Sequence, residues 1–342
     1  MNEKEIPMNL RDEEQNPSEE TKRFISSLPS DIDCYGIKMF KYKGCWYEKN
    51  ILQAILSFQK SFEPQETDII VASFPKSGTT WLVALAFALV RRSKYLSNDG
   101  HPLLSHNPHD LVPFLEIELY NNVNKSSKPD LTKFSSSSSP RLFSTHMSFH
   151  ALQVPLKKES PCKIVYVRRK VKDVLVSLYH FNKSHKGVLW GGEGSGVEEI
   201  TIEDLFESFC TGVTYFGPYW DQVLSYWRGS LEDPKHVLFM RYEELKSEPH
   251  AQIKRLAEFL ECPFTEEEEQ SGLVDKILEL CSFRNLSGLE INKTGKSWIG
   301  LDFKTLYRRG EVGDSKNYLT PEMETKIDMI TEEKLKGSGL KL

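Results

Sequence analysis

Four short apolar runs, accompanied by helical patterns, constrain what this chain of 342 residues can fold into. The runs are apolar nearly throughout instead of alternating, which is typical of strands that are covered on both faces. They are DIIVASF (68–74), RLFST (141–145), CKIVYVRR (162–169) and HVLFMRY (236–242). Helical patterns lie between or after them, over residues 81–90, 171–184 and 249–260. This alternation predicts an α/β fold with a doubly wound central parallel sheet flanked by helices on both faces.

Composition and charge limit the possible partners. With 39% hydrophobic residues, 27% charged residues and a formal net charge of −5, the chain has the composition of a soluble globular protein and no general attraction for polyanions. We therefore expect no nucleic-acid partner and no membrane association, and the sequence holds no apolar run long enough to span a bilayer. Any site for an anion must be built locally.

The chain is expected to form one domain with two polar appendages. Residues 1–22 are predicted to be a disordered acidic arm, residues 23–342 a single domain, and residues 124–140 a low-complexity surface insertion within it. The N-terminal stretch lacks the apolar core of a signal peptide. The six cysteines are scattered without a C-x-x-C pair, which favours free thiols and a cytoplasmic location.

The loop between the first apolar run and the first helical pattern carries the strongest chemical signal. It reads FPKSGTTW (74–81). Such a loop exposes backbone N–H groups at the positive end of the helix dipole, Gly78 allows a ligand to approach closely, and Lys76 adds a charge. Its hydroxyl groups can donate to phosphate oxygens, and they belong to Ser77, Thr79 and Thr80. The alternative is a strand-to-helix turn that Ser or Thr caps.

The same loop differs from the phosphate-binding loop of metal-dependent NTPases. That motif has a lysine after its second glycine, whereas Lys76 precedes the single glycine here. The sequence shows no clear acidic residue dedicated to Mg²⁺ at the end of a later strand. We therefore expect a phosphorylated ligand from which a group is transferred without a metal.

Three ordered motifs resemble those of the cytosolic sulfotransferases. FPKSGTTW is similar to their 5′-phosphosulfate loop, YVRRKVKDVLVSLYHF (166–181) to their 3′-phosphate segment, and RRGEVGDSKNYLT (308–320) to their C-terminal R-K-G-x-x-G-D-W-K signature. NPHDLVPFLE (107–116) and LFSTHMSF (142–149) resemble the plant branch. The resemblance implies a P-loop-like fold. It also implies an enzyme that moves a sulfuryl group from 3′-phosphoadenosine 5′-phosphosulfate (PAPS) to a hydroxyl of a small acceptor without a metal.

The resemblance also implies roles for individual residues. His146 would be the general base, although a histidine near a strand end is on position alone more often structural, and Lys76 would stabilise the leaving oxygen. The 5′-phosphosulfate would lie on the loop from Lys76 to Thr80. The 3′-phosphate would be held by Arg169, Ser177, Arg308, Arg309 and Gly310. The adenosine would be held by Trp81, Tyr242, Cys281, Ser282 and Phe283, for which packing in the core is the alternative role.

Several positions depart from the family pattern. Ser315 replaces the tryptophan of G-D-W-K, Cys281 stands where threonine is frequent, and Arg309 replaces lysine. We expect the loss of the large tryptophan side chain to loosen the segment around Ser315 and to lower donor affinity. Two alternative functions therefore stay open: a degenerate member that binds PAP or PAPS with little or no catalysis, and, with less support, a nucleotide-dependent phosphotransferase.

Other charged and histidine residues receive structural interpretations. Arg168 is expected to be a surface charge, and His106 and His109 are expected to serve in turns or caps because no third metal ligand accompanies them. The dimer motif of the animal branch has no clear match after Thr320, so the oligomeric state stays open.

The acceptor pocket is predicted around residues 35–47, residues 101–116, the residues after His146 and the glycine-rich stretch 186–199. The glycines at 191–196 are expected to mark a mobile loop over the site. These regions are rich in aromatic side chains, namely Phe40, Tyr42, Trp46, Phe149 and Trp190. These side chains favour an aromatic or polycyclic acceptor such as a flavonoid, a steroid or a hydroxyjasmonate. The alternative is that they are ordinary core residues.

Overall fold

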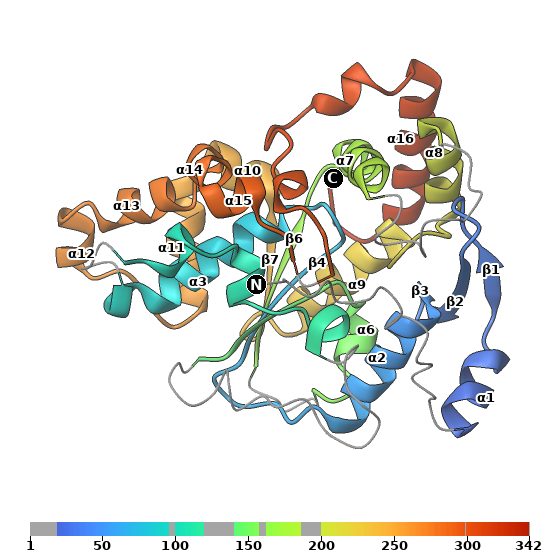
Figure 1. Ribbon diagram of the computed structural model, residues 1–342, viewed down its shortest axis with the longest axis horizontal. Coiled ribbons are helices and arrows are strands. Elements are labelled where there is room, and N and C mark those ends of the chain that lie inside the picture. The colour runs from blue at the N-terminus through green and yellow to red at the C-terminus, as the bar shows by residue number, and fades with distance from the viewer. Residues whose placement is uncertain are drawn as a thin grey trace, which may run out of the picture.

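A four-stranded parallel sheet forms the centre of the protein (Figure 1). The structure is a computed structural model that describes residues 19–95, 100–119, 140–156, 162–185, 200–297 and 299–341. The strands are β4 (Ile69–Ser73), β5 (Leu142–Thr145), β6 (Lys163–Arg168) and β7 (Val237–Arg241), in the order β5-β4-β6-β7. The four predicted strands are therefore confirmed, each slightly shorter than its apolar run.

Helices cover both faces of this sheet, as predicted. Along β4, Ile70 and Ala72 face one hydrophobic cluster, and Ile69 and Val71 face the other. The first face is covered by α2 (Lys49–Ser61), α6 (Phe149–Leu152) and α9 (Tyr219–Glu232), and the second by α3 (Thr79–Tyr95), α11 (Pro249–Phe259) and α13 (Leu273–Leu280) (Figure 1). Burial of both faces explains why the strands are apolar throughout instead of alternating.

The predicted helical patterns correspond to α3, α7 (Val171–Ser184) and α11. The other α-helices are α1 (Glu19–Ser27), α4 (Pro108–Leu111), α8 (Ile202–Thr211), α10 (Tyr242–Ser247), α12 (Glu266–Gln270), α14 (Phe283–Gly288), α15 (Glu290–Thr294) and α16 (Pro321–Leu335). Shorter turns are the 3₁₀ segments η2 (Pro102–Leu104), η4 (Phe303–Leu306) and η5 (Asp314–Asn317), and the π-helical turn η3 (Leu115–Leu119). Among the helices described, none is long and apolar enough to cross a membrane.

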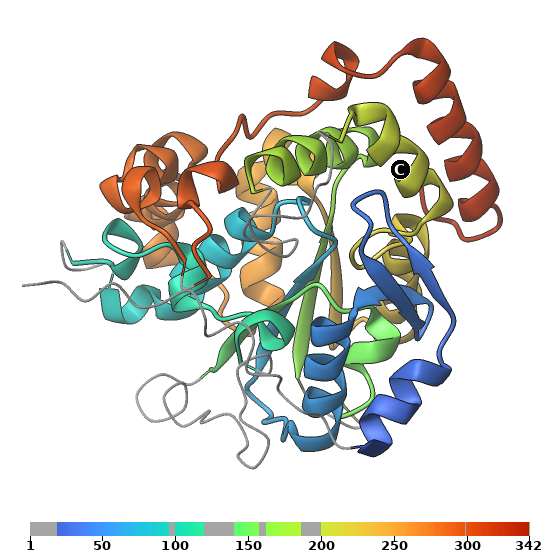
Figure 2. The ribbon, with the colours of Figure 1, turned by 45° about the vertical axis from the view of Figure 1, so that its right-hand side comes forward.

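A small antiparallel sheet near the N-terminus was not predicted. It consists of β1 (Ser30–Ile32), β2 (Lys38–Tyr42) and β3 (Cys45–Glu48), and it lies beside α2 (Figure 2). The turn between β2 and β3 has positive φ at Lys43 (49°) and Gly44 (86°), which is the geometry of a tight hairpin. Gly44 between two short runs rich in aromatic residues was the available signal.

The predicted appendages fall largely outside the described residues. Of the acidic arm predicted over residues 1–22, residues 1–18 lie outside them, and the remaining ones begin helix α1. The predicted insertion at 124–140 lies outside them up to residue 139. The glycine-rich stretch 186–199, with the mobile loop predicted at 191–196, lies outside them entirely.

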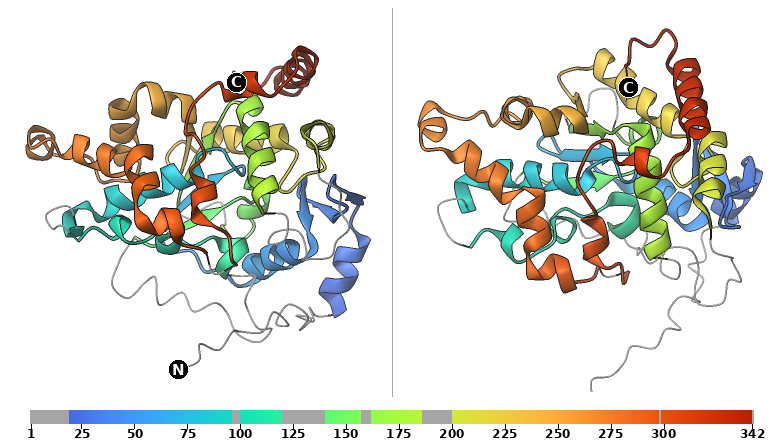
Figure 3. Two further views of the ribbon diagram at one scale, coloured as in Figure 1. Left: turned by 45° about the horizontal axis from the view of Figure 1, so that its top comes forward. Right: turned by 90° about the horizontal axis from the view of Figure 1, so that it is seen from above.

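The C-terminal segment returns across the sheet and brings distant residues together. After η4 the chain runs past α7, and α16 then packs against α7, α8 and α9 (Figure 3). This path places residues 308–315 beside the N-terminal half of α7.

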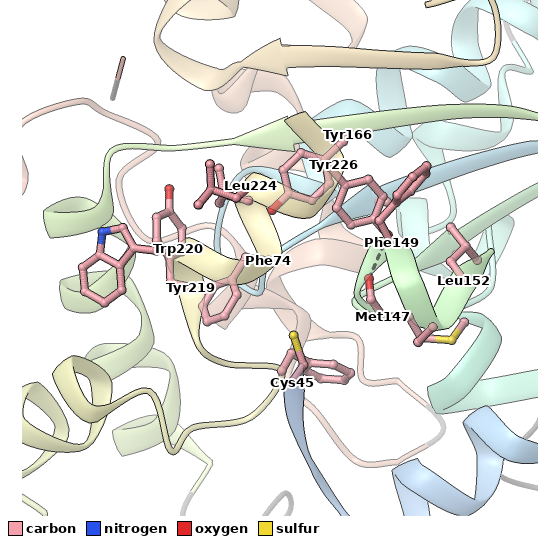
Figure 4. Packing of buried hydrophobic residues seen from close by; sticks show 14 of the residues in the cluster. Cys45, Phe74, Met147, Phe149, Leu152, Tyr166, Tyr219, Trp220, Leu224 and Tyr226 are labelled. Atoms are coloured by element: carbon pink, nitrogen blue, oxygen red, sulfur yellow. Dashed lines mark hydrogen bonds between the residues drawn. The ribbon is translucent and has the colours of Figure 1, made fainter. Parts of the chain in front are cut away.

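Helices α6 and α9 pack against each other on the first face of the sheet (Figure 4). The hydroxyl of Tyr226 donates to the carbonyl oxygen of Met147 at 2.7 Å. Gly229 faces the ring of Phe149, and a Cβ at position 229 would lie 2.4 Å from a ring carbon. Absence of a side chain at Gly229 therefore permits the contact that positions α6.

We predict that Gly229→Ala lowers the free energy of unfolding by about 1–3 kcal/mol, because overpacking outweighs the higher helix propensity of alanine. Gly288→Ala is the matched control, since a Cβ at that helical position meets nothing within 4 Å. It is expected to leave stability unchanged or to raise it slightly. Chemical denaturation measures both, and equal stability of the two variants would contradict the packing account.

Candidate active site

The carboxyl ends of the four parallel strands place the predicted site residues along one edge. The loop from Phe74 to Gly78 follows β4, His146 follows β5, Arg169 follows β6, and Tyr242 follows β7. Ligands of open α/β sheets bind at this edge. The structure thus brings together residues that are far apart in sequence.

The loop after β4 has a strained backbone that opens toward this edge. Lys76 has a φ of 67° and Gly78 a φ of 108°, and a Cβ at Gly78 would lie 2.7 Å from the ring of Tyr242. The first N–H groups of α3 lack acceptors within the helix, as at any helix start. The Ser77 hydroxyl is buried with no hydrogen-bond partner among the described residues, whereas the Thr79 hydroxyl lies 2.6 Å from that of Ser73. The loop therefore offers unused donors to an anion.

Three cations converge on this loop. Burial lowers the pKa of Lys76 to about 7, and the charges of Arg169 and Arg308 contribute to the shift. No carboxylate forms an ion pair with Lys76 in the described part of the chain, and its Nζ lies 4.0 Å from the centre of the Phe181 ring. Two guanidinium groups beside a lysine that has no ion-pair partner among the described residues are costly to the fold unless an anion joins them.

The two arginines are oriented by neighbours from other elements. Arg169 is buried, donates to the carbonyl oxygen of Glu311 at 2.6 Å, and lies 4.8 Å from the centre of the Tyr242 ring. Arg308 forms an ion pair with Asp314 at 2.6 Å. The Nε atoms of both arginines are buried without hydrogen-bond partners in the described residues. Donors that remain free in this way suit a phosphate.

The other residues predicted for the 3′-phosphate differ in how far they are exposed. Ser177 lies on α7 and is buried. Arg309 pairs with Asp314, and its side chain is 50% exposed. Gly310 has a φ of 66° and lies under the ring of Phe283, where a Cβ would approach to 2.5 Å.

Asp173 anchors the C-terminal segment to α7. Its carboxylate accepts the backbone N–H of Gly313 at 2.8 Å and that of Ser315 at 3.0 Å, and Asp173 itself is buried. These two bonds use the main chain, so they do not depend on the side chain at position 315. Asp173 was not identified from the sequence, although its place in the first turn of α7 was visible there.

Aromatic side chains line the part of the edge predicted to hold adenine. Trp81 packs edge-on against Tyr242 with ring centres 5.5 Å apart, and Phe283 is 37% exposed. Cys281 is fully buried in the core, and the Ser282 hydroxyl accepts the N–H of Asn285 at the start of α14. Of the residues predicted around adenosine, the three aromatic ones therefore offer ring surface.

His146 presents one nitrogen to the site. Its Nδ1 lies 2.8 Å from the carbonyl oxygen of Ser73, which can only accept, so Nδ1 carries the proton and Nε2 keeps its lone pair. Its ring lies between those of Phe114 and Phe216, at 4.7 and 5.3 Å between centres. Burial lowers its pKa to about 4, partly opposed by the hydrogen bond to Ser73. His146 is therefore a neutral imidazole near pH 7.

Two sequence predictions are corrected. Arg168 is buried, not on the surface, and pairs with Glu243 at 3.0 Å because β6 ends inside the protein. His109 does not serve a turn or cap with its side chain, since its Nε2 lies 2.9 Å from the Thr80 hydroxyl. Burial lowers the pKa of His109 to about 3. His106, by contrast, lies in a turn as expected, with Nδ1 2.9 Å from the Ser105 hydroxyl.

Comparisons with known proteins agree with this arrangement. The sulfotransferase domain family matches residues 66–339. The chain is 70% identical to cytosolic sulfotransferase 8 and 65% identical to cytosolic sulfotransferase 9 of Arabidopsis thaliana, with both chains covered in full. A putative steroid sulphotransferase from Arabidopsis thaliana has a TM-score of 0.70 at 40% identity, covering 96% of this chain and 98% of its own. Mouse sulfotransferase SULT7A1, solved with PAP, has a TM-score of 0.62 at 26% identity, covering 88% and 95%.

Fold, site edge and relatives together define an enzyme that transfers a group from a nucleotide donor. The chain belongs to the cytosolic sulfotransferase family, in its plant branch, and is a PAPS-dependent sulfotransferase. The resemblance of the three sequence motifs is thereby confirmed.

We predict that Lys76→Met stabilises the fold at pH 7 by roughly 1–2 kcal/mol. This is only a part of the free energy that corresponds to the full pKa shift, because Lys76 is partly exposed and solvent screens its charge. The folded-state pKa lies below that of an unfolded lysine. The cost of charging Lys76 is therefore fully present below pH 7 and disappears as the pH rises toward the unfolded value. Lys276→Met, at an exposed helical lysine, is the control and should change little. Equal effects of both substitutions would contradict the buried-charge account.

Proposed function

We propose that this enzyme transfers the sulfuryl group of PAPS to a hydroxyl of a small aromatic or polycyclic acceptor by in-line attack, with His146 as general base. The carrying observation is the single free nitrogen of His146, at the same sheet edge as the converging Lys76, Arg169 and Arg308. A base for the acceptor and positive charge for the leaving group are the two requirements of this transfer.

We propose two separate phosphate sites for the donor. Lys76, Ser77, Gly78, Thr79 and Thr80 hold the 5′-phosphosulfate, supported by the unused hydroxyl of Ser77 and the free N–H groups at the start of α3. The 3′-phosphate site is formed by Arg169, Ser177, Arg308, Arg309 and Gly310. Its support is the pair of buried arginine Nε atoms without partners in the described residues.

The adenosine lies between these sites on the aromatic side chains of Trp81, Tyr242 and Phe283, next to Cys281 and Ser282. The partial exposure of Phe283 supports this role, because a purely structural phenylalanine is usually buried. No metal takes part, since Lys76, Arg169 and Arg308 supply the positive charge that phosphoryl-transfer enzymes obtain from Mg²⁺.

The chemical step begins when Nε2 of His146 accepts the proton of the acceptor hydroxyl. The acceptor oxygen then attacks sulfur, and the bond between sulfur and the bridging oxygen breaks. Lys76 stabilises the negative charge that develops on that oxygen. The lowered pKa of His146 keeps the imidazole neutral and ready to accept a proton.

The acceptor is proposed to lie among the rings around His146. Phe114 and Phe216 flank His146, and Phe181 faces Lys76, so a planar acceptor would meet aromatic surface. One related structure is that of a putative steroid sulphotransferase, and this relationship supports a polycyclic acceptor. Flavonoids, steroids and hydroxyjasmonates are the classes to test.

We further propose a cytoplasmic protein whose residues 23–342 form one sulfotransferase domain. Relatives matched over the full chain are named cytosolic sulfotransferases, and the family match spans residues 66–339. The six cysteines are all free thiols, as expected for a reducing compartment.

We predict transfer of label from ³⁵S-PAPS to a member of an acceptor panel of flavonoids, steroids and hydroxyjasmonates, undiminished by EDTA. A calorimetric titration of PAP on the same preparation accompanies the assay. Tight PAP binding without transfer to any acceptor would favour the degenerate alternative, and Ser315→Trp then tests whether position 315 is responsible. Absence of PAP binding would overturn the proposed donor site.

We predict that His146→Ala abolishes transfer but leaves PAP affinity unchanged, since the histidine does not belong to the proposed donor site. Lys76→Ala should raise the barrier by roughly 2 kcal/mol or more, the scale of losing one charge-stabilising group. Initial rates and PAP titrations of both variants check this. An equal loss of PAP binding in His146→Ala would count against its role as base.

A further inference from the structure

Glu116 is a fully buried carboxylate directly behind the proposed base. It lies in η3, beside the end of β5, and is 0% exposed. One carboxylate oxygen, Oε1, accepts the backbone N–H of His146 at 2.6 Å, and the other, Oε2, accepts the hydroxyl of Thr145 at 2.8 Å. Both oxygens are therefore used on the turn that carries His146.

Other groups hold the remaining polar atoms of His146. Its carbonyl oxygen accepts Nε2 of Gln222 at 2.7 Å, and its Nδ1 donates to Ser73 at 2.8 Å. With its N–H on Glu116, every polar atom of the residue except Nε2 is engaged. The histidine is thus fixed so that only the nitrogen proposed to accept the proton is free.

The charge of Glu116 has no counter-ion in the described part of the chain. A hydrogen bond with a purely structural role would not require a buried charge. Asp68, another fully buried carboxylate, is paired with Arg141 at 2.5 Å. Burial raises the pKa of Glu116 to about 7, opposed by the hydrogen bonds from His146 and Thr145. A glutamine would meet the backbone N–H without this cost.

The groups that face Glu116 do not neutralise it. Burial raises the pKa of the Tyr47 hydroxyl in β3 and of the Tyr226 hydroxyl in α9 well above the usual value, and the charge of Glu116 raises both further. Both hydroxyls are therefore uncharged. Helix α2, which also packs on η3, contributes apolar buried residues such as Leu52 and Ile55. His146 is therefore the group near Glu116 that gains charge during the proposed reaction.

We propose that Glu116 is a positioning residue that fixes His146 and whose negative charge stabilises the imidazolium formed during transfer. This inference rests on the proposed function. The acceptor O–H bond breaks, its proton goes to Nε2 of His146, and the oxygen's electron pair forms the bond to sulfur while the bridging S–O bond breaks. Glu116 keeps its own ionisation state in this step and acts only through His146.

The test compares wild type with Glu116→Gln and Glu116→Asp, using ³⁵S-PAPS at saturating concentration and an acceptor that wild type sulfates. Glutamine keeps the size of the side chain and one acceptor oxygen but removes the charge, and aspartate keeps the charge at shorter reach. Thermal unfolding and PAP titration control for loss of fold or donor site. Asp68→Asn removes a buried carboxylate away from His146 and serves as the matched control for a general loss of stability.

For Glu116→Gln at pH 8 we expect kcat to fall on the order of tenfold, the low end of the range known for the hydrogen-bond partners of metal-bound histidines, which orient an imidazole in the same way. PAP affinity should stay within about twofold of wild type. Glu116→Asp should retain more activity than Glu116→Gln, and Asp68→Asn should keep the wild-type kcat.

The pH profile distinguishes charge from mere positioning. Glu116 is protonated below about pH 7, so kcat of wild type should rise between pH 6 and 8, and this rise should be absent in Glu116→Gln. Lys76 is present in both proteins and its titration contributes equally to both profiles, so the ratio of the two profiles reports on Glu116.

Wild-type kcat and pH profile in Glu116→Gln would overturn the inference, as would a loss of transfer that parallels a loss of PAP binding. If Glu116→Gln does not fold, a wild-type kcat without a rise between pH 6 and 8 overturns it. Absence of transfer in wild type with every acceptor would instead mean that the proposed function fails.

Discussion

Burial of the central sheet on both faces is the constraint on which the rest of this structure depends. Since β4 is covered by α3 on one side and by α2 on the other, neither face of the strand can carry polar chemistry. Functional groups are left with the ends of the strands. Each of the four parallel strands accordingly ends in a residue of the candidate site, and the chain must cross the sheet repeatedly to assemble it.

Gathering the functional groups at one edge of the sheet also places several charged side chains close together. At the carboxyl ends of the strands, Lys76 and Arg169 lie near Arg308 of the C-terminal segment. Glu116 lies buried behind the backbone of His146. Burial lowers the pKa of Lys76 and raises that of Glu116, so it disfavours the charged form of both groups. Under the proposed function, this cost to folding is offset when the donor binds and when His146 accepts a proton. The site is thus prepared for charges that arrive or develop during the reaction.

Much of this arrangement was predictable from the sequence because its signals are local. The four strands followed from uninterrupted apolar runs, and the loop around Gly78 from its composition between a strand and a helix. The hairpin β1–β3 was missed because its strands are short and only Gly44 marks the turn. The segment predicted to loosen at Ser315 is instead held by hydrogen bonds from its backbone N–H groups to Asp173. Such main-chain bonds do not depend on which side chain stands at position 315, so the substitution of tryptophan did not indicate them.

The remaining differences are tertiary. Burial of Arg168 depends on Glu243, and the contact of His109 with Thr80 depends on how α4 packs against α3. Glu116 becomes recognisable only when β5 and η3 lie side by side. No periodicity or spacing along the chain encodes such pairings.

The proposed donor site consists of two separate cationic sites that recognise a nucleotide with phosphates at both its 5′ and 3′ positions. The most direct test is a calorimetric comparison of PAP with 5′-AMP, which lacks the 3′-phosphate, on one preparation containing EDTA. The account predicts that PAP binds at least about 100-fold more tightly, since the second site adds two or more charge-assisted hydrogen bonds. Equal affinities for the two nucleotides would contradict it.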